Sequence, residues 1–187
     1  MLAPILPRAF YNRPTVEVAR DLLGKVLAHR NRSGIIVETE AYLGGDDLAA
    51  HSARGITPRT QVIFGPPGHA YIYLIYGMHR CLNLVAEPDG EPGCVLIRAL
   101  EPLSGFDPSP DPHAASGPGK LTRALLISQE QNGIDVTSGD LVVRDRSAKP
   151  DIAVTPRIGI TKCADLPLRF AIAGNNFVSG RVRRSRS

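Results

Sequence analysis

The chain has 187 residues, of which 43 % are hydrophobic and 21 % are charged, and its formal net charge is +4. This composition excludes an intrinsically disordered chain and predicts a single folded domain over 1–187. A charge excess of this size permits nucleic-acid binding without requiring it. The N-terminus lacks the features of a secretory signal, no run reaches the ~18 apolar residues of a membrane span, and the 3 cysteines form no CxxC pair. We therefore expect a cytoplasmic protein, associated with the nucleoid if it is bacterial, that is monomeric and has no membrane partner, no metal and no other cofactor.

The N-terminal part is expected to hold a helix followed by a strand. Val18, Leu22 and Val26 recur at helical spacing after a Pro-Thr pair, which predicts a helix over 15–30. The run GIIVETEAYL at 34–43 alternates with period two and predicts a strand. One face of this strand is expected to lie in the core and carries Ile35, Val37, Thr39 and Ala41. The other face begins with an apolar residue and ends with polar groups, and it carries Ile36, Glu38, Glu40 and Tyr42.

Further along the chain, short elements are separated by breaks rich in Gly and Pro. The run 69–87 predicts two strands joined by a tight turn at 76–79, and 93–101 predicts a third strand. Residues 104–117 are rich in Pro, Ser and Asp, and a mobile loop is expected there. The remaining expected elements are helices over 46–52, from Thr57 and over 120–128, and short strands over 141–144, 157–160 and 168–173. Together they predict an α+β fold, a single domain with a mixed, mostly antiparallel curved β-sheet and surrounding helices.

Two carboxylates and an aromatic ring share one face of the predicted 34–43 strand. Period two places Glu38, Glu40 and Tyr42 on the same side. An ionised carboxylate at a strand end can act as a general base towards water, and a ring beside it suits a pocket for a flat ligand. A pair of solvent-facing glutamates on an edge strand explains Glu38 and Glu40 equally well when they are taken alone, and Tyr42 favours the pocket.

Three of the 5 tyrosines lie within the run 71–76. Tyr71 and Tyr73 share a strand face, which a buried β surface explains. Tyr76 has the opposite parity and lies at the predicted turn beside Gly77, where a buried surface does not explain an aromatic residue. A ring in that position is suited to wedge between base pairs from the minor groove.

Arg98 and His51 are further candidate site residues. Arg98 lies within an apolar strand, where an unpaired charge is too costly to bury, so Glu38 or Glu40 is expected as its partner. That pair is either a structural ion pair or a means of keeping the carboxylate ionised and positioning a water. His51 has no metal-ligand spacing around it, and a structural hydrogen bond is the more common role for such a histidine.

Two basic features are candidates for contact with a phosphate backbone. The run GPGK at 117–120 lies at a predicted helix start but lacks the spacing of a P-loop. It is either a plain helix start or a place where backbone amides and Lys120 hold one phosphate. Four arginines crowd 181–187, and this basic tail is either a frayed, solvated end or a nucleic-acid contact.

Several runs span nearly the whole chain in a fixed order. They are ARDLLGKVL (19–27), IVETEAYLGGDDLAAHS (36–52), TPR (57–59), YIYLIYGMHRCLN (71–83), CVLIRALEP (94–102), GPGKL (117–121), PRIGI (156–160) and PLRF (167–170). Together they resemble the alkyladenine (3-methyladenine) DNA glycosylase family. The second run followed by the Tyr-rich run is the most specific part of this resemblance.

The resemblance implies a base-excision-repair enzyme that flips alkylated or deaminated purines (3-methyladenine, hypoxanthine, ethenoadenine) out of duplex DNA. It implies that water hydrolyses the N-glycosidic bond and leaves an abasic site. Glu40 would be the general base, and Arg98 and the backbone carbonyl of Ile158 would help to hold the water. The resemblance implies no amine-nucleophile role for either lysine of these motifs, Lys25 or Lys120, so a monofunctional enzyme without lyase activity is expected.

The same resemblance implies how the base and the DNA would be held. Tyr42 would stack on one face of the flipped base, and His51 and Tyr73 on the other. Asn83 would oppose the 2-amino group of guanine. The residues implied in contact with double-stranded DNA are Tyr76, which would fill the gap left in the duplex, Met78 beside it, Thr57, Arg59 and Lys120.

Three other functions remain open on the sequence alone. An RNA- or tRNA-handling enzyme of similar fold would differ in substrate, and a minor-groove wedge suits duplex DNA better. A non-catalytic binding module has no need of a carboxylate such as Glu40 facing an anionic ligand. A protein-interaction domain built on the tyrosine run leaves the buried Arg98 unexplained.

Overall fold

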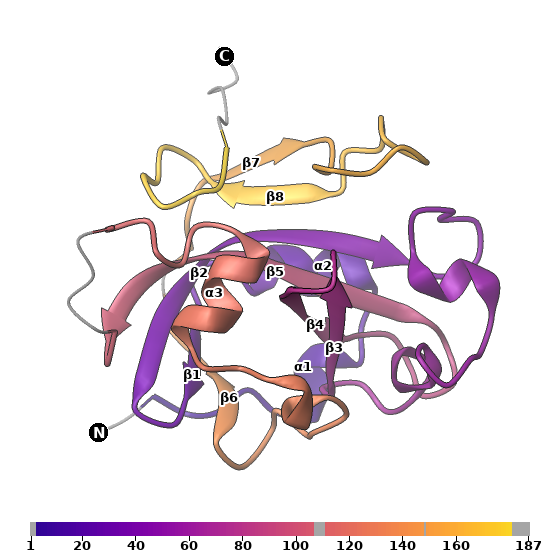
Figure 1. The fold of residues 1–187 in the computed structure, drawn as a ribbon, viewed down its shortest axis with the longest axis horizontal. Coiled ribbons are helices and arrows are strands. Elements are labelled where there is room, and N and C mark those ends of the chain that lie inside the picture. The colour runs from indigo at the N-terminus through magenta and orange to yellow at the C-terminus, as the bar shows by residue number, and fades with distance from the viewer. Residues whose placement is uncertain (1–2, 107–110, 148, 181–187) are drawn as a thin grey trace.

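A curled sheet of eight strands, with neighbouring strands antiparallel, organises the part of the chain that the structure describes (Figure 1). The computed structural model describes residues 3–106, 111–147 and 149–180. The strands are β1 (Val26–His29), β2 (Arg32–Leu43), β3 (Ala70–Ile75), β4 (His79–Val85), β5 (Gly93–Ser104), β6 (Leu141–Arg144), β7 (Ile152–Thr155) and β8 (Arg169–Ile172). Their order is β3-β4-β5-β2-β1-β6, with β8 paired to β2 and β7 to β8. The predicted α+β class with a curved sheet is confirmed.

Short helices lie against this sheet. They are α1 (Arg8–Tyr11), α2 (Thr15–Asp21) and α3 (Pro118–Ala124), with the 3-10 helices η1 (His51–Arg54), η2 (Gln61–Phe64) and η3 (Gln129–Gln131). Helix α2 packs on β2 and β5, and α3 packs on β4 and β5. Both helices bury apolar side chains in the largest hydrophobic cluster, Val18 from α2 and Leu121 from α3. None of the helices in the described residues is long and apolar enough to cross a membrane.

The helix expected over 15–30 is wrong in its second half. Helix α2 ends at Asp21, and Gly24 adopts a positive φ of 83°, a left-handed conformation that terminates a helix. Val26 lies instead in β1, where it pairs with Ile35. Apolar residues at helical spacing therefore continued across a helix-to-strand boundary, and the glycine marks the true end.

Other expected elements differ in type or position. The strand expected over 157–160 is a loop, in which Gly159 has a φ of 78°, and the strand in this region is β7, several residues earlier. The expected helices over 46–52 and from Thr57 are turns followed by the 3-10 helices η1 and η2. The helix expected over 120–128 is α3, which begins two residues earlier, at Pro118, and ends at Ala124. The hydroxyl of Thr57 accepts a hydrogen bond from the amide of Thr60 at 3.2 Å within this turn.

Some expectations lie outside the described residues. The basic tail at 181–187 is one of them, and residues 107–110 of the loop expected over 104–117 are another. Strand β5 extends as far as Ser104, three residues beyond the strand expected over 93–101.

A β-bulge in β2 decides which side chains face the site. The pairing of β2 with β5 skips Val37 between the pairs Ile36–Leu100 and Glu38–Ala99, so Val37 is an extra residue of β2. At the next pair, Thr39–Ile97, the pairing skips Arg98 of β5. At this point the other edge of β2 changes partner from β1 to β8. The bulge reverses the alternation, so the predicted faces are wrong in their first half. Ile36 joins Ala41 in the main core, and Val37 packs in the small cluster on the opposite face.

Candidate active site

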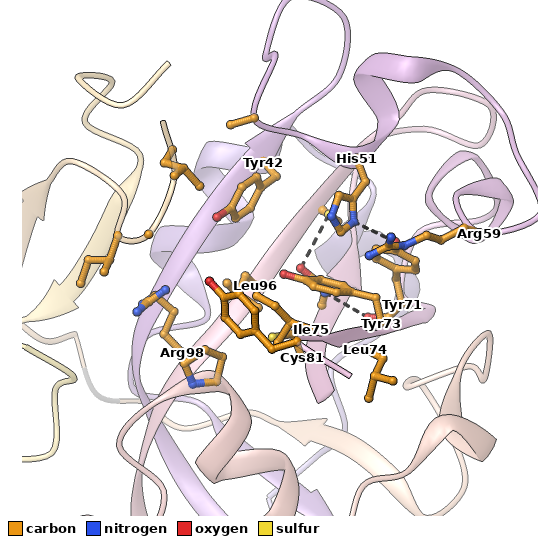
Figure 2. Close-up of a pocket in the computed structure, with 18 residues that line it drawn as sticks. Tyr42, His51, Arg59, Tyr71, Tyr73, Leu74, Ile75, Cys81, Leu96 and Arg98 are labelled. Atoms are coloured by element: carbon orange, nitrogen blue, oxygen red, sulfur yellow. Dashed lines mark hydrogen bonds between the residues drawn. The ribbon is translucent and has the colours of Figure 1, made fainter. Parts of the chain in front are cut away.

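A cavity of about 390 Å³ opens beside the β3–β4 hairpin. Its lining comes from the central strands, from the segment around η1 and from the loop after β7: Tyr42, Ala49, His51, Arg59, Tyr71, Tyr73, Asn83, Cys94, Leu96, Arg98 and Ile158 are among these residues. Figure 2 shows Tyr42 on one side and the rings of His51, Tyr71 and Tyr73 on the other. The cavity therefore has the flat aromatic walls that suit a planar ligand.

Glu40 lies directly beneath this cavity and is fully buried. Its Oε1 accepts a hydrogen bond from the backbone amide of Ile158 at 2.8 Å and lies 3.3 Å from Nη1 of Arg98. Its Oε2 accepts a hydrogen bond from the hydroxyl of Tyr42 at 3.0 Å. All three partner residues line the cavity, so the carboxylate lies next to the space a ligand would fill. The amide of Ile158, and not its carbonyl, is the group that contacts Glu40.

Burial raises the pKa of Glu40, and three nearby groups oppose that rise. The charge of Arg98, the Ile158 amide and the Tyr42 hydroxyl all favour the ionised form, and the net direction is upward. A carboxylate held in this way is a stronger base than an exposed one and still has donors that support its charge.

Arg98 has the anionic partners that the sequence required. Its Nε donates to Oε1 of Glu38 at 3.1 Å, while Nη1 faces Glu40. Burial lowers the pKa of Arg98, but the two carboxylates outweigh burial and raise it. The prediction of a partner in Glu38 or Glu40 is confirmed, and the guanidinium in fact bridges both.

His51, Tyr71 and Tyr73 form the aromatic wall opposite Tyr42. The ring of His51 packs edge-on against Tyr73 with centroids 4.5 Å apart, and Nδ1 hydrogen-bonds with the hydroxyl of Tyr71 at 2.9 Å. Burial, together with the charges of Arg59 and Arg54, lowers the pKa of His51 to about 4. His51 is therefore a neutral imidazole at pH 7.

The floor and mouth of the cavity hold the remaining predicted residues. Asn83 is buried, and its Nδ2 donates to the carbonyl of Tyr71 at 3.1 Å. At the tip of the hairpin, Tyr76 is 84 % exposed with a φ of 52°, and Met78 is 69 % exposed. The guanidinium of Arg59 lies 5.5 Å from the centre of the Tyr73 ring.

Two predicted DNA contacts have local partners. Thr57 is tied into its own turn by hydrogen bonds with Thr60. Nζ of Lys120 lies 3.3 Å from a carboxylate oxygen of Asp111 and 3.4 Å from the carbonyl of His113. The side chain of Lys120 is 46 % exposed.

A buried ion pair that the sequence did not reveal fixes the rim of the site. The two terminal nitrogens of Arg157, Nη1 and Nη2, donate to Asp47 at 2.6 and 2.8 Å, and the Arg157 and Asp47 side chains are 0 % and 1 % exposed. The guanidinium also lies 4.7 Å from the centre of the Tyr42 ring. Asp47 and Arg157 are 110 residues apart, so no local pattern could have paired them. The described residues contain no group of three or more metal-ligating side chains.

Comparison with known proteins identifies the family. The profile described as methylpurine-DNA glycosylase (MPG) matches residues 9–176. The chain belongs to the methylpurine-DNA glycosylase family. It is therefore a monofunctional DNA glycosylase, a hydrolase of base excision repair. The matched range contains all the candidate residues of the cavity.

Relatives from distant organisms match over almost their full length. A candidate 3-methyladenine DNA glycosylase of Koribacter versatilis is 52 % identical over 96 % of this chain and 95 % of that protein. Proteins with the same description from Methanoculleus marisnigri and Methanocella arvoryzae are also 52 % identical, over 94 % and 89 % of this chain and 99 % and 90 % of their own.

Proposed function

We propose that this glycosylase removes alkylated and deaminated purines, such as 3-methyladenine, hypoxanthine and ethenoadenine, from double-stranded DNA by base flipping and Glu40-assisted hydrolysis. The observation that carries the proposal is the placement of the buried Glu40 directly beneath an aromatic cavity, held by Arg98, Tyr42 and the Ile158 amide. A buried carboxylate with a raised pKa, next to a slot for a flat ring, is the combination that base excision requires.

Access to the glycosidic bond requires the damaged nucleotide to leave the stack. Flipping costs a few kcal/mol and costs least for weakly paired lesions. The exposed ring of Tyr76 is positioned at the hairpin tip to fill the gap, with Met78 beside it. Stacking of the flipped base between Tyr42 and the pair His51 and Tyr73 would return about 1–3 kcal/mol per aromatic contact. These terms nearly cancel, which favours bases whose pairing is already weak.

In the chemical step, water attacks C1′ of the sugar as the bond from C1′ to the purine nitrogen breaks. The bonding electrons go to the departing purine, and Glu40 takes the proton of the water and stabilises the positive charge that develops on the sugar. A cationic alkylated purine leaves without further help, whereas a neutral purine has to gain a proton.

Glu38 is poorly placed to supply that proton. It is fully buried, and its two carboxylate oxygens accept hydrogen bonds from Arg98, Arg169 and the Ser179 amide. Water is therefore the proton source that we propose for neutral purines.

Release of free base from duplexes carrying 3-methyladenine, hypoxanthine or ethenoadenine tests the proposal. Glu40→Gln should bind lesion duplex as the wild type does and lose single-turnover base release by at least ~100-fold, the usual contribution of a general base. Glu17→Gln, on the exposed face of α2, is the matched control and should release base at the wild-type rate. Undiminished release by Glu40→Gln would refute the role of Glu40.

A further inference from the structure

Glu38 accepts hydrogen bonds at both carboxylate oxygens, although it does not line the cavity. Its Oε1 accepts from Nε of Arg169 at 2.6 Å and from Nε of Arg98 at 3.1 Å, and its Oε2 accepts from the amide of Ser179 at 2.7 Å. Its side chain is 0 % exposed. The shorter contact is with Arg169, so Arg169 is the principal counter-charge of Glu38.

Arg169 is itself fixed on three sides. Strand β8 places it opposite Glu40 in the β2 ladder, and its side chain is 4 % exposed. Besides Glu38, its guanidinium donates to the hydroxyl of Thr155 at 3.1 Å and to the carbonyl of Ser179 at 2.8 Å. None of these contacts reaches the cavity, because Arg169 and Glu38 are absent from its lining.

The four charged side chains form a balanced, buried row. Two carboxylates, Glu38 and Glu40, alternate with two guanidiniums, Arg98 and Arg169, and Arg98 bridges the carboxylates through different nitrogens. Buried charges require compensation, and an unbalanced carboxylate in such a row would draw Arg98 towards itself. Arg169 supplies the charge that Glu38 needs and so leaves Nη1 of Arg98 for Glu40.

We propose that Glu38 and Arg169 are a charge-balancing pair that positions Arg98 against Glu40 and thereby sets the basicity of the reacting carboxylate. The inference rests on the proposed role of Glu40, and it assigns a function to two residues that touch neither the base nor the sugar. Both are positioning residues.

The charged, titratable and hydrogen-bonding groups that face Glu40 determine how its pKa should respond when the charge of Glu38 or Arg169 is removed. They are Arg98 from β5, Glu38 and Tyr42 from β2, Cys81 from β4, and Arg157 and the Ile158 amide from the loop after β7. The charge of Glu38 raises the pKa of Glu40, and that of Arg98 lowers it. Removing the charge of Glu38 should therefore lower the pKa of Glu40. Removing the charge of Arg169 should raise it, because Glu38 is then less neutralised and attracts Arg98.

The test is the pH dependence of single-turnover release of 3-methyladenine from duplex DNA methylated with dimethyl sulfate. This cationic base leaves without protonation, so the acid limb of the profile reports the general base. Glu38→Gln should move the acid limb to lower pH, and Arg169→Gln should move it to higher pH, each by about one unit or more. Arg169→Lys retains the charge and should stay close to the wild type. The double variant Glu38→Gln/Arg169→Gln restores neutrality and should lie between the two single variants.

The outcomes separate this inference from the proposed function. Undiminished release by Glu40→Gln would overturn the proposed function and this inference with it. Two results would overturn only the positioning role, provided that Glu40→Gln is inactive. One is that Glu38→Gln and Arg169→Gln leave the acid limb of the pH profile at the wild-type pH. The other is that both variants move the acid limb in the same direction. If the single variants unfold, urea titration compares the stability of the double variant with that of each single variant and so tests the charge-balancing pair. Recovery of a folded state supports the charge-balancing pair, and a double variant no more stable than either single variant contradicts it.

Discussion

Replacement of Asp47 by Asn tests how much of the rim of the active site depends on one buried ion pair. The Asp47 and Arg157 side chains are 1 % and 0 % exposed, and two nitrogen–oxygen contacts of 2.6 and 2.8 Å join them. Breaking a buried pair by removing one charge typically costs about 3–5 kcal/mol, because the other charge stays buried. Asparagine retains one acceptor oxygen, so we expect about 3 kcal/mol. In a protein of this size that corresponds to a fall in Tm of roughly 6–12 °C.

Urea and thermal unfolding followed by circular dichroism measure this loss. Asp21→Asn is the matched control, because Arg13 and Asp21 also form an ion pair, at 2.9 Å, but their side chains are 32 % and 54 % exposed. That exposed pair should contribute about 1 kcal/mol or less. If Asp47→Asn lowers the free energy of unfolding no more than Asp21→Asn does, the argument from burial is wrong.

The pH dependence of this pair has a definite sign. Burial raises the pKa of Asp47, but the hydrogen bonds from Arg157 and from the Leu43 amide outweigh it and hold the pKa below its ordinary value. A carboxyl whose pKa is lower in the folded state stabilises the fold above its unfolded pKa of about 4 and loses that contribution as the pH falls further. The difference in stability between the wild type and Asp47→Asn should therefore shrink below about pH 4.

Two further predictions concern single residues of the site. Tyr76→Ala should weaken binding to lesion duplex roughly 10-fold in fluorescence anisotropy, as expected for loss of one stacking contact. Because Tyr76 is 84 % exposed, the same variant should change the free energy of unfolding by less than about 0.5 kcal/mol. Unchanged affinity would argue against a wedge. The pKa of His51, about 4, is lower in the folded state than its ordinary value, so the wild type should lose stability as the pH falls from about 7 towards 4. His51→Gln should lose less over that range in urea titrations at pH 7 and pH 5, and an equal loss in both proteins would contradict the burial of a neutral imidazole.

Local sequence patterns were sufficient for much of the fold and for the chemistry-bearing residues. Alternation over 38–42 places Glu40 and Tyr42 on one face, and in the structure Tyr42 lines the cavity and donates a hydrogen bond to Glu40. The cost of burying Arg98 predicted an acidic partner, and the exposed Tyr76 lies at the turn that the sequence indicated. These conclusions depend on neighbours within a strand or a hairpin, where the backbone fixes which side chains share a face.

The predicted faces of β2 and the predicted end of the first helix were wrong because both depend on how strands pair in the sheet. The bulge at Val37 reverses the alternation of β2, and it occurs where the second edge of that strand passes from β1 to β8. Apolar residues at helical spacing ran through Gly24 although the chain changes there from helix to strand. Neither the bulge nor the helix-to-strand boundary interrupts the pattern of apolar residues in the sequence, so hydrophobic periodicity could not detect either of them.

The sequence by itself thus determined which carboxylate is the candidate base, its aromatic neighbour, the buried arginine and the hairpin that carries the exposed tyrosine. Only the tertiary structure decided what surrounds them. Arg157 meets Asp47 across 110 residues, and Arg169 meets Glu38 across 131. The physical reason is that a buried charge requires a counter-charge, and the local sequence shows that a charged residue is buried when its neighbours in the strand are apolar. The identity of that partner depends on which distant strand or loop the closed sheet brings alongside.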